Sequence, residues 1–142
     1  MADEKPRPPS RGRLHLVVVS HDRTLLDREC DEVGLPGRLG DLGILPGHAA
    51  YVGALRPGVL TLLDGRDTVR AAISAGFCEV LADQVTVLVD DARFPADLDA
   101  KQSAAALQEA LSQLEHAESE EIEAIQDRIA LAEAQVAIAA AG

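Results

Sequence analysis

The chain has 142 residues, which suits one domain of ordinary size or a small domain with an appendage. Its formal net charge of −11 argues against nucleic acid or an anionic membrane surface as a direct partner. No apolar run reaches the length of about 18 residues that a membrane-spanning helix needs, so we expect no such helix.

Residues 1–13 are rich in proline and basic residues and contain no apolar segment, so they do not resemble a secretory signal. We expect this stretch to be a disordered leader. The two cysteines, Cys30 and Cys78, have no metal-ligand spacing. Because the sequence shows no secretion signal, we expect reduced, buried thiols in preference to a disulfide.

Residues 14–93 are typical of short strands separated by turns. The predicted strands cover residues 14–19, 30–35, 59–63, 67–73, 77–81 and 84–89. Asp64-Gly65 and Ala82-Asp83 lie between pairs of these runs, where two-residue turns would close hairpins. Strands at this spacing predict an antiparallel sandwich or barrel, and the high apolar content favours the sandwich because two inner faces must be filled.

Residues 35–49 hold two Pro-Gly pairs, at 36–37 and 46–47, together with Gly40 and Gly43. Proline removes a backbone donor and glycine favours positive φ, so we predict a long ordered loop here and no regular strand. Its many apolar residues argue against a solvated linker. Long ordered loops are frequently functional, which makes this segment the candidate site.

After Phe94-Pro95 the pattern changes, and residues 98–141 contain no glycine or proline. Apolar residues recur there at helical spacing in two stripes, Leu107, Leu111 and Leu114, then Ile122, Ile125 and Ile129. The short polar break between the stripes predicts an antiparallel helical hairpin over residues 97–141, with Ser119 as the cap of the second helix. We expect the stripes to face each other. The predicted class is therefore α+β, an amino-terminal antiparallel β-sandwich followed by a carboxy-terminal antiparallel two-helix hairpin.

The sequence offers no constellation for catalysis. It contains neither Gly-x-x-x-x-Gly-Lys-Ser/Thr nor Gly-x-Gly-x-x-Gly, the two common phosphate-binding loops. Ser20, His21 and Asp22 are triad residue types, but adjacent residues cannot converge as a triad requires, so we expect a turn between strands. The four histidines share no metal spacing. We therefore expect no catalytic residue, no cofactor site and no metal site.

The segment Gly-Asp-Leu-Gly-Ile-Leu-Pro-Gly-His-Ala, residues 40–49, closely resembles the signature loop of the epsilon subunit of F-type ATP synthases. Four further segments resemble that family in the same order. Residues 14–19 match its first strand, 56–59 its Lys-Pro-Gly-Val turn, 74–77 its Ser-Gly-Gly-Phe segment and 85–88 its last strand. The match is continuous over residues 14–98, and the tail is similar in pattern more than in residues.

The resemblance implies a non-catalytic rotor subunit of the central stalk, which couples the gamma subunit to the membrane c-subunit ring during proton-driven ATP synthesis. It implies a peripheral position on the cytoplasmic face of an energy-transducing plasma or inner membrane, with contacts from the tail to the beta and alpha subunits. The implied subunit-interface residues are Asp41, Leu42, Gly43, Ile44, Pro46, Gly47, His48 and Ala49. Asp41 matches the acidic residue that faces the ring, and His48 matches the histidine on the gamma side. From the residues alone, the ring of His48 has a second explanation, in which it holds the loop to the next strand.

Two departures from the family concern the tail. Members that bind ATP open the first helix with Leu/Ile-Asp-x-x-Arg-Ala, whereas this chain has Gln102 and Ser103 in place of the arginine and alanine. A glutamine amide cannot offset phosphate charge as a guanidinium does, so the sequence argues against ATP binding to the tail. Residues 118–142 contain Arg128 as their only basic residue against six acidic ones, whereas inhibitory second helices are often basic. We therefore expect a closed tail with only a weak regulatory role.

The residues alone suggest two other functions that compete with the rotor subunit. A small hydrolase on a β-scaffold, with the loop as its active site, would need a nucleophile with a base, a metal cluster or a phosphate loop, and the sequence shows none. A stand-alone adaptor, whose helical hairpin binds partner helices, is compatible with the apolar stripes of the tail. This adaptor is the main alternative to the rotor subunit.

Overall fold

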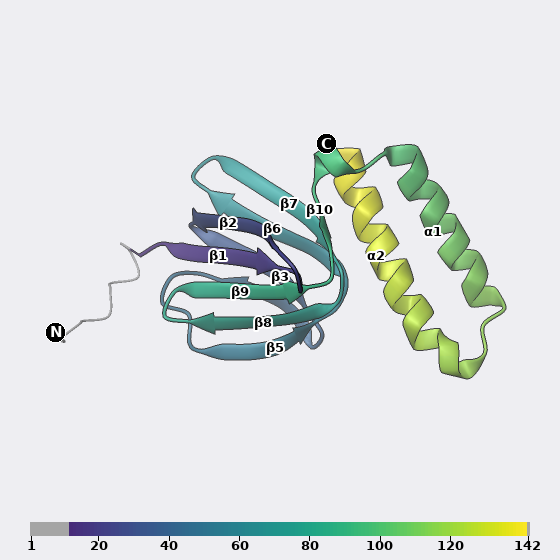
Figure 1. Cartoon of the computed structure of the whole chain (residues 1–142), viewed down its shortest axis with the longest axis horizontal. Coiled ribbons are helices and arrows are strands. Elements are labelled where there is room, and N and C mark those ends of the chain that lie inside the picture. The colour runs from purple at the N-terminus through teal and green to yellow at the C-terminus, as the bar shows by residue number, and fades with distance from the viewer. Residues whose placement is uncertain (1–11, 142) are drawn as a thin grey trace.

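The computed structural model describes residues 12–141, in which a β-sandwich is followed by two helices (Figure 1). The strands are β1 (Leu14–Val19), β2 (Thr24–Cys30), β3 (Glu32–Gly37), β4 (Gly40–Ile44), β5 (Tyr51–Leu55), β6 (Gly58–Asp64), β7 (Asp67–Ile73), β8 (Gly76–Leu81), β9 (Gln84–Val89) and β10 (Ala92–Arg93). The helices are α1 (Ala100–Glu115) and α2 (Ile122–Ala141), preceded by single 3₁₀ turns, η2 (Pro95–Asp97) and η3 (Ser119–Glu121). The predicted class, a sandwich followed by a helical hairpin, is confirmed. The predicted leader lies outside the described residues except for Gly12 and Arg13.

The strands form one continuous hydrogen-bonded sheet in the order β10-β7-β6-β3-β5-β8-β9-β1-β2, and β4 pairs with β3. The sheet folds over on itself, so that β2 also contacts β6 and two layers enclose the core. The prediction of antiparallel pairing holds for every pair except β1 with β9, which run parallel with Val17 opposite Thr86. Parallel neighbours need a long connection between them, and all the strands from β2 to β8 supply it here.

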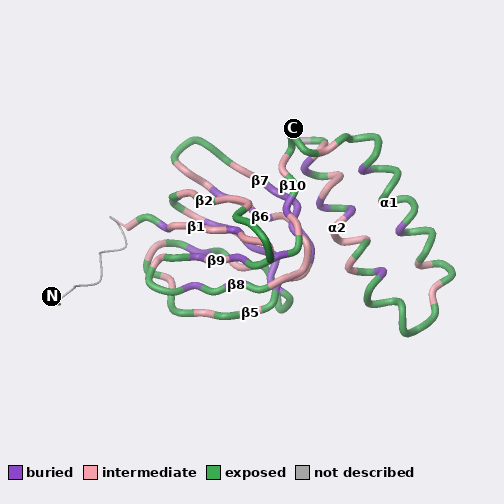
Figure 2. The backbone as a smooth tube through the Cα atoms, in the orientation of Figure 1, coloured by how far each residue is buried: buried purple, intermediate pink, exposed green. Residues whose placement is uncertain are grey.

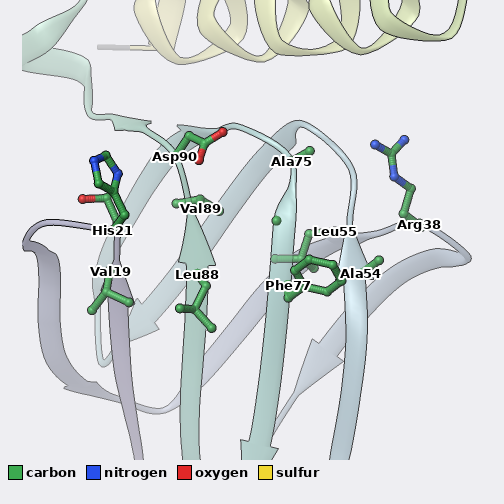
Figure 3. A pocket seen from close by; sticks show the side chains of 12 residues that line it. Val19, His21, Arg38, Ala54, Leu55, Ala75, Phe77, Leu88, Val89 and Asp90 are labelled. Carbon is green, nitrogen blue, oxygen red and sulfur yellow. The ribbon is translucent and has the colours of Figure 1, made fainter.

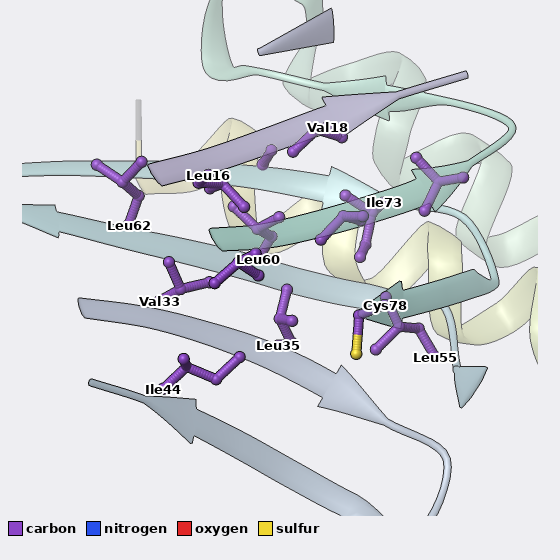
Figure 4. Packing of buried hydrophobic residues seen from close by; sticks show 14 of the residues in the cluster. Leu16, Val18, Val33, Leu35, Ile44, Leu55, Leu60, Leu62, Ile73 and Cys78 are labelled. Atoms are coloured by element: carbon purple, nitrogen blue, oxygen red, sulfur yellow. The ribbon is translucent and has the colours of Figure 1, made fainter. Parts of the chain in front are cut away.

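The core is built from aliphatic side chains on the inward positions of alternating strands (Figure 4). In β1, for example, Leu14, Leu16 and Val18 are buried while their neighbours are half-exposed. Cys30 and Cys78 belong to the same core and are free, as predicted. Burial raises the pKa of both thiols, because the charged thiolate loses its hydration inside the sandwich.

The predicted loop over residues 35–49 is wrong for its first half, where β3 and β4 form a tight hairpin. Proline is tolerated at Pro36 because β3 changes partners at this point. Its pairing with β6 ends at Gly34, and its pairing with β5 occurs at Gly37. The missing N–H of Pro36 therefore falls in a gap between two ladders and interrupts neither. The second half of the segment, after β4, is irregular as predicted.

The other hairpins follow the sequence closely. Ala82 and Asp83 form the predicted turn between β8 and β9, and both have positive φ, 50° and 67°. The β6–β7 turn is shifted by one residue from the predicted pair, because Asp64 pairs with Asp67 and the positive φ of 62° falls at Gly65. The sequence patterns do not predict β2 or β5. In both strands, the residues at the outward positions interrupt the alternation of apolar and polar side chains that would indicate a strand.

The helices lie side by side, and α2 packs on β6 and β7 (Figures 1 and 2). Ala134 and Ile138 of α2 pack with Ala72 of β7, and Val59 of β6 borders this cluster. Because α2 covers this part of the outer face, β7 is buried on both faces over residues 71–73. The helical hairpin is therefore closed and docked on the sandwich.

The predicted face-to-face packing of the two stripes is only partly right. Ile125 is 6% exposed, but Leu111 and Ile122 remain 39% and 37% exposed. The fully covered positions of α1 are small, Ser103 and Ala110, so the helices meet through small side chains more than through leucines.

The predicted cap at Ser119 is also wrong. Ser119 opens the turn η3, which leads directly into α2. The carboxylate of Glu121 instead accepts a hydrogen bond of 3.1 Å from the backbone N–H of Glu118. Acidic side chains at this end also suit the positive pole of the helix.

Candidate partner-binding surfaces

The signature segment, residues 40–49, begins as strand β4 and ends in an irregular corner before β5. Its apolar residues anchor it: Ile44 is fully buried in the core, and Leu42 packs against the core from its edge. Ile44 therefore presents no surface here, although it belongs to the predicted interface set. The remaining predicted residues are reachable from outside, with Asp41, Gly43, Gly47 and Ala49 exposed and Pro46 and His48 half-buried.

Asp41 extends from the start of β4 and pairs with Arg56 at 2.5 Å, while 81% of its side chain stays exposed. The turn that follows β5 positions this arginine. The N–H of Arg56 donates to the carbonyl of Pro36 at 2.9 Å, and Gly58 lies so close that an added Cβ would be 2.7 Å from the ring of Pro36. Because an exposed ion pair of this kind is weak, the carboxylate of Asp41 stays available to a partner.

His48 lies in the corner after β4, where its ring nitrogen Nδ1 is 2.7 Å from the carbonyl oxygen of the next residue, Ala49. The ring bond is therefore local. The corner is tied to the sheet by a different contact, in which the N–H of Gly47 donates to the carboxylate of Asp83 at 2.8 Å. Asp83 thus positions the corner from the β8–β9 turn, a role that its place in a predicted turn does not reveal.

The structure does not bring Asp41 and His48 together. Asp41 lies beside the β3–β4 turn, at the end of the sandwich where Leu55 pairs with Gly76. His48 lies near the β8–β9 turn, which closes the opposite end of the same strands. The signature segment therefore supplies two separate contact zones, one at each end of β4.

A third surface is not predicted by the sequence, namely the outer face of β5, β8 and β9. It carries four exposed apolar side chains, Val52 (72% exposed), Phe77 (60%), Leu81 (57%) and Leu88 (49%), which we call the outer apolar face. Strand pairing places Phe77 opposite Leu88, so the side chains of neighbouring strands adjoin. One feature of the sequence could have indicated this face, because both the inward and the outward positions of β8 are largely apolar. Glu79 lies on the same outward face between Phe77 and Leu81. Exposed apolar side chains grouped in this way, with a polar residue among them, mark a protein-binding site.

The outer apolar face continues into a groove of about 470 Å³ at the end of the sheet nearest the helices (Figure 3). Phe77 and Leu88 line its apolar part, while His21, Arg38 and Asp90 lie around its rim. An apolar centre with charges of both signs at the rim is the usual composition of a protein interface.

The tail offers little to a triphosphate. Asp99 caps α1 by accepting a hydrogen bond of 3.0 Å from the N–H of Gln102, and Gln102 itself is exposed. The groove between α1 and α2, about 630 Å³, contains Arg128 as its one arginine or lysine, opposite several glutamates. That guanidinium already donates to Gln113 at 2.5 Å. The absence of ATP binding stays a prediction, and the charge of this groove is consistent with it.

The residues that resemble a triad form the predicted turn between β1 and β2. The hydroxyl of Ser20 donates to Asp22 at 2.9 Å, and this bond lowers the pKa of that carboxyl group. Within residues 12–141, no three His, Cys, Asp or Glu side chains are grouped so as to hold a metal ion. Neither described helix combines the length and the apolarity needed to cross a membrane.

Comparison with known proteins agrees with this arrangement. The family described as "ATP synthase, Delta/Epsilon chain, beta-sandwich domain" matches residues 13–95. The ATP synthase epsilon chain of Maricaulis maris is 38% identical over 77% of this chain and 82% of its own length. The ATP synthase epsilon chain of Magnetococcus marinus is also 38% identical, over 87% of this chain and 92% of its own length.

A solved structure extends the likeness to the helices. A chain in the cryo-EM structure of the Euglena gracilis mitochondrial ATP synthase, described as OSCP/F1/c-ring, superposes with a TM-score of 0.74 at 26% identity. The superposition covers 92% of this chain and 82% of the Euglena chain, so it includes sandwich and tail. The chain therefore belongs to the ATP synthase Delta/Epsilon chain family.

Proposed function

We propose that this chain is the epsilon-type subunit of an F-type ATP synthase, a non-catalytic rotor component that links the gamma subunit to the c-subunit ring. Within this family, the outer apolar face is the observation that best supports the proposal. A subunit that catalyses no reaction must act by binding its neighbours, and it needs surfaces for this. In this role the chain lies peripherally, on the cytoplasmic face of an energy-transducing membrane.

Gamma is the partner that best fits the outer apolar face. Its four large apolar side chains form the largest exposed apolar group on the sandwich, and Leu81 ends next to the β8–β9 turn that holds the His48 corner. The Leu81 end of the apolar face therefore lies close to this corner. A permanent partner such as a stalk subunit suits an apolar centre, because obligate interfaces are more hydrophobic than transient ones.

The c-subunit ring fits the other end of β4. Asp41 is largely exposed there, in a hairpin whose backbone is fixed by the buried Ile44 and by the turn at Arg56. The exposed carboxylate of Asp41 suits hydrogen bonding to the polar loops of a ring, and the turn beside it also presents Leu39, which is 99% exposed. Separate zones for gamma and the ring are what a linking subunit needs.

The test is affinity purification of the tagged chain from native membranes, with identification of the proteins that accompany it. We expect the gamma and c subunits together with the alpha and beta subunits. Phe77→Asp in the outer apolar face should lose gamma, whereas Leu111→Asp, an equal change on the exposed side of α1, should retain it. Recovery of unrelated helical proteins through the tail, without gamma, would favour the stand-alone adaptor.

A further inference from the structure

The helical hairpin is joined to the sandwich at two points. The first is the apolar cluster of Ala134 and Ile138 against Ala72. The second is an ion pair between Arg38 and Asp127, whose two hydrogen bonds measure 3.0 and 2.6 Å and span 89 positions of the chain. Asp127 precedes Ala134 by seven residues, which is about 10 Å along a helix. Two separated attachments fix the direction of a helix, whereas the cluster alone would let α2 pivot.

The ion pair has the geometry of a strong one. The two guanidinium nitrogens of Arg38 each donate to a different carboxylate oxygen of Asp127, in a fork-to-fork arrangement. The side chains are 41% and 32% exposed, so water and salt partly screen the pair, and its strength depends on the two parallel hydrogen bonds. The hydrogen bond to Asp127 raises the pKa of Arg38.

Arg38 is held in place before it meets the helix. It lies in the two-residue turn between β3 and β4, and its backbone N–H donates to the carbonyl of Ala54 in β5 at 2.9 Å. Figure 3 shows its guanidinium directed toward the helices. The sandwich thus fixes the backbone of Arg38, and docking of α2 has to order only its side chain.

The net charges of the sandwich and of the helical hairpin have the same sign and oppose docking. Residues 14–96 carry a net charge of −5 and residues 97–142 a net charge of −8, so the sandwich and the tail repel each other overall. Among residues 12–141, the Arg38–Asp127 pair is the one ion pair that joins the two. Glu123, one turn before Asp127, adds a further attraction to the same arginine.

We propose that Arg38 and Asp127 form an electrostatic latch that keeps α2 docked on the sandwich. With the latch closed, the apolar cluster stays covered. With the latch broken, the overall repulsion acts unopposed at this end of α2, and the hairpin leaves the sheet more often while the sandwich stays folded. This latch is a property of the isolated chain and does not depend on the proposed role in ATP synthase.

The experiment measures thiol labelling of the full chain. A reporter cysteine is placed under the docked helix by Ala72→Cys or, in a separate protein, by Ala134→Cys, so that it reacts when the hairpin undocks. The native Cys30 and Cys78 are buried in the sandwich core and report its unfolding in the same sample. Each reporter is combined with Arg38→Asp, Asp127→Arg, or both, and with Arg66→Asp as a control that makes the same charge change in the exposed β6–β7 turn.

We expect either single reversal to accelerate labelling of the reporter at least about fivefold, the factor that corresponds to about 1 kcal/mol. The double reversal should restore the parent rate, the Arg66→Asp control should match the parent, and high salt should shrink the differences. Labelling of Cys30 and Cys78 should not change.

Three results would overturn the latch. Single reversals that leave the reporter at the parent rate would show that the apolar cluster alone holds the tail. A reporter that reacts in the parent as fast as a free cysteine would show that the hairpin is not docked in solution. Core cysteines that react in step with the reporter would show that undocking and unfolding are one event, and a local latch would then have nothing to control.

Discussion

The sandwich and the helical hairpin are held together in different ways. The sandwich has a continuous aliphatic core to which nearly every strand contributes, and its strands form one hydrogen-bonded sheet that folds over this core. The hairpin touches the sandwich through a small cluster of two alanines and one isoleucine, bordered by Val59 and Leu98, and through one ion pair. We infer from this difference that the sandwich is stable without the hairpin. The position of the hairpin, in contrast, depends on a few residues that can be substituted one at a time.

The largest effect should come from the sandwich core. Leu60 in β6 is fully buried at the centre of the cluster (Figure 4). Leu60→Ala should lower the free energy of unfolding by about 2–5 kcal/mol, because it removes buried methyl groups and leaves a cavity. Denaturant unfolding followed by circular dichroism measures this loss. A loss below about 1 kcal/mol would show that the core relaxes around the cavity and carries less of the stability than we infer.

The next effect should be on binding. Phe77→Asp should weaken binding to gamma by at least about 2 kcal/mol, roughly 30-fold in Kd, because a charge replaces an aromatic side chain that the proposed interface would cover. The melting temperature should change little, since the side chain is 60% exposed in the free chain. Titration calorimetry with purified gamma gives the affinity. Unchanged affinity would place the gamma contact elsewhere.

A smaller effect should appear at the hairpin. Ile138→Ala should weaken docking of α2 by about 2 kcal/mol, the transfer free energy of the apolar surface that it removes. The strands should keep their hydrogen-exchange protection, and only the amides that α2 shields should exchange faster. Equal loss of protection in β1 and β9, on the far side of the sandwich, would mean that the two parts share one cooperative unit.

The smallest effect should be pH-dependent and confined to the sandwich. The hydrogen bond from Arg28, followed by that from Arg13, lowers the pKa of Asp64 below its usual 3.8. A lowered pKa in the folded state stabilises the fold above pH 3.8, and this contribution disappears as the pH falls through the folded-state value.

Asp64→Asn should therefore melt slightly below the parent at pH 7, and the two should converge in acid. Asp67→Asn is the matched control, because this neighbour is 76% exposed and lies 3.6 Å from the same Arg28. A difference between Asp64→Asn and the parent that persists at pH 2 would point to lost packing and not to charge.

Many strands, turns and helices of this fold can be predicted from the sequence, because short-range patterns determine them. Alternation in β1, the turn at Ala82-Asp83 and the helical spacing of the tail each act over a few residues, so they predict elements without knowledge of the rest. The β3–β4 hairpin could not be predicted, because the proline at Pro36 is harmless only where β3 exchanges β6 for β5 as its partner. That exchange depends on strands far along the chain.

The candidate surfaces, like the fold, can be predicted from the sequence only in part. The signature segment identifies Asp41 and His48, but only the fold shows that they lie at opposite ends of β4. The outer apolar face depends on which strands adjoin, and the contact between Arg38 and Asp127 depends on how the tail docks. Contacts between residues this distant in sequence have no local pattern, so a single sequence does not reveal them.

The most direct test of the central claim is to remove residues 100–142 and measure the affinity of the remaining chain for gamma. The claim is that the sandwich alone is the folded, partner-binding unit and that the hairpin is an accessory docked on it. We expect a cooperative β-rich fold and a Kd for gamma within about threefold of the full chain, since the outer apolar face and the His48 corner remain intact. An unfolded product, or a Kd more than about 30-fold weaker, would contradict the account and assign part of the core or of the gamma interface to the helices.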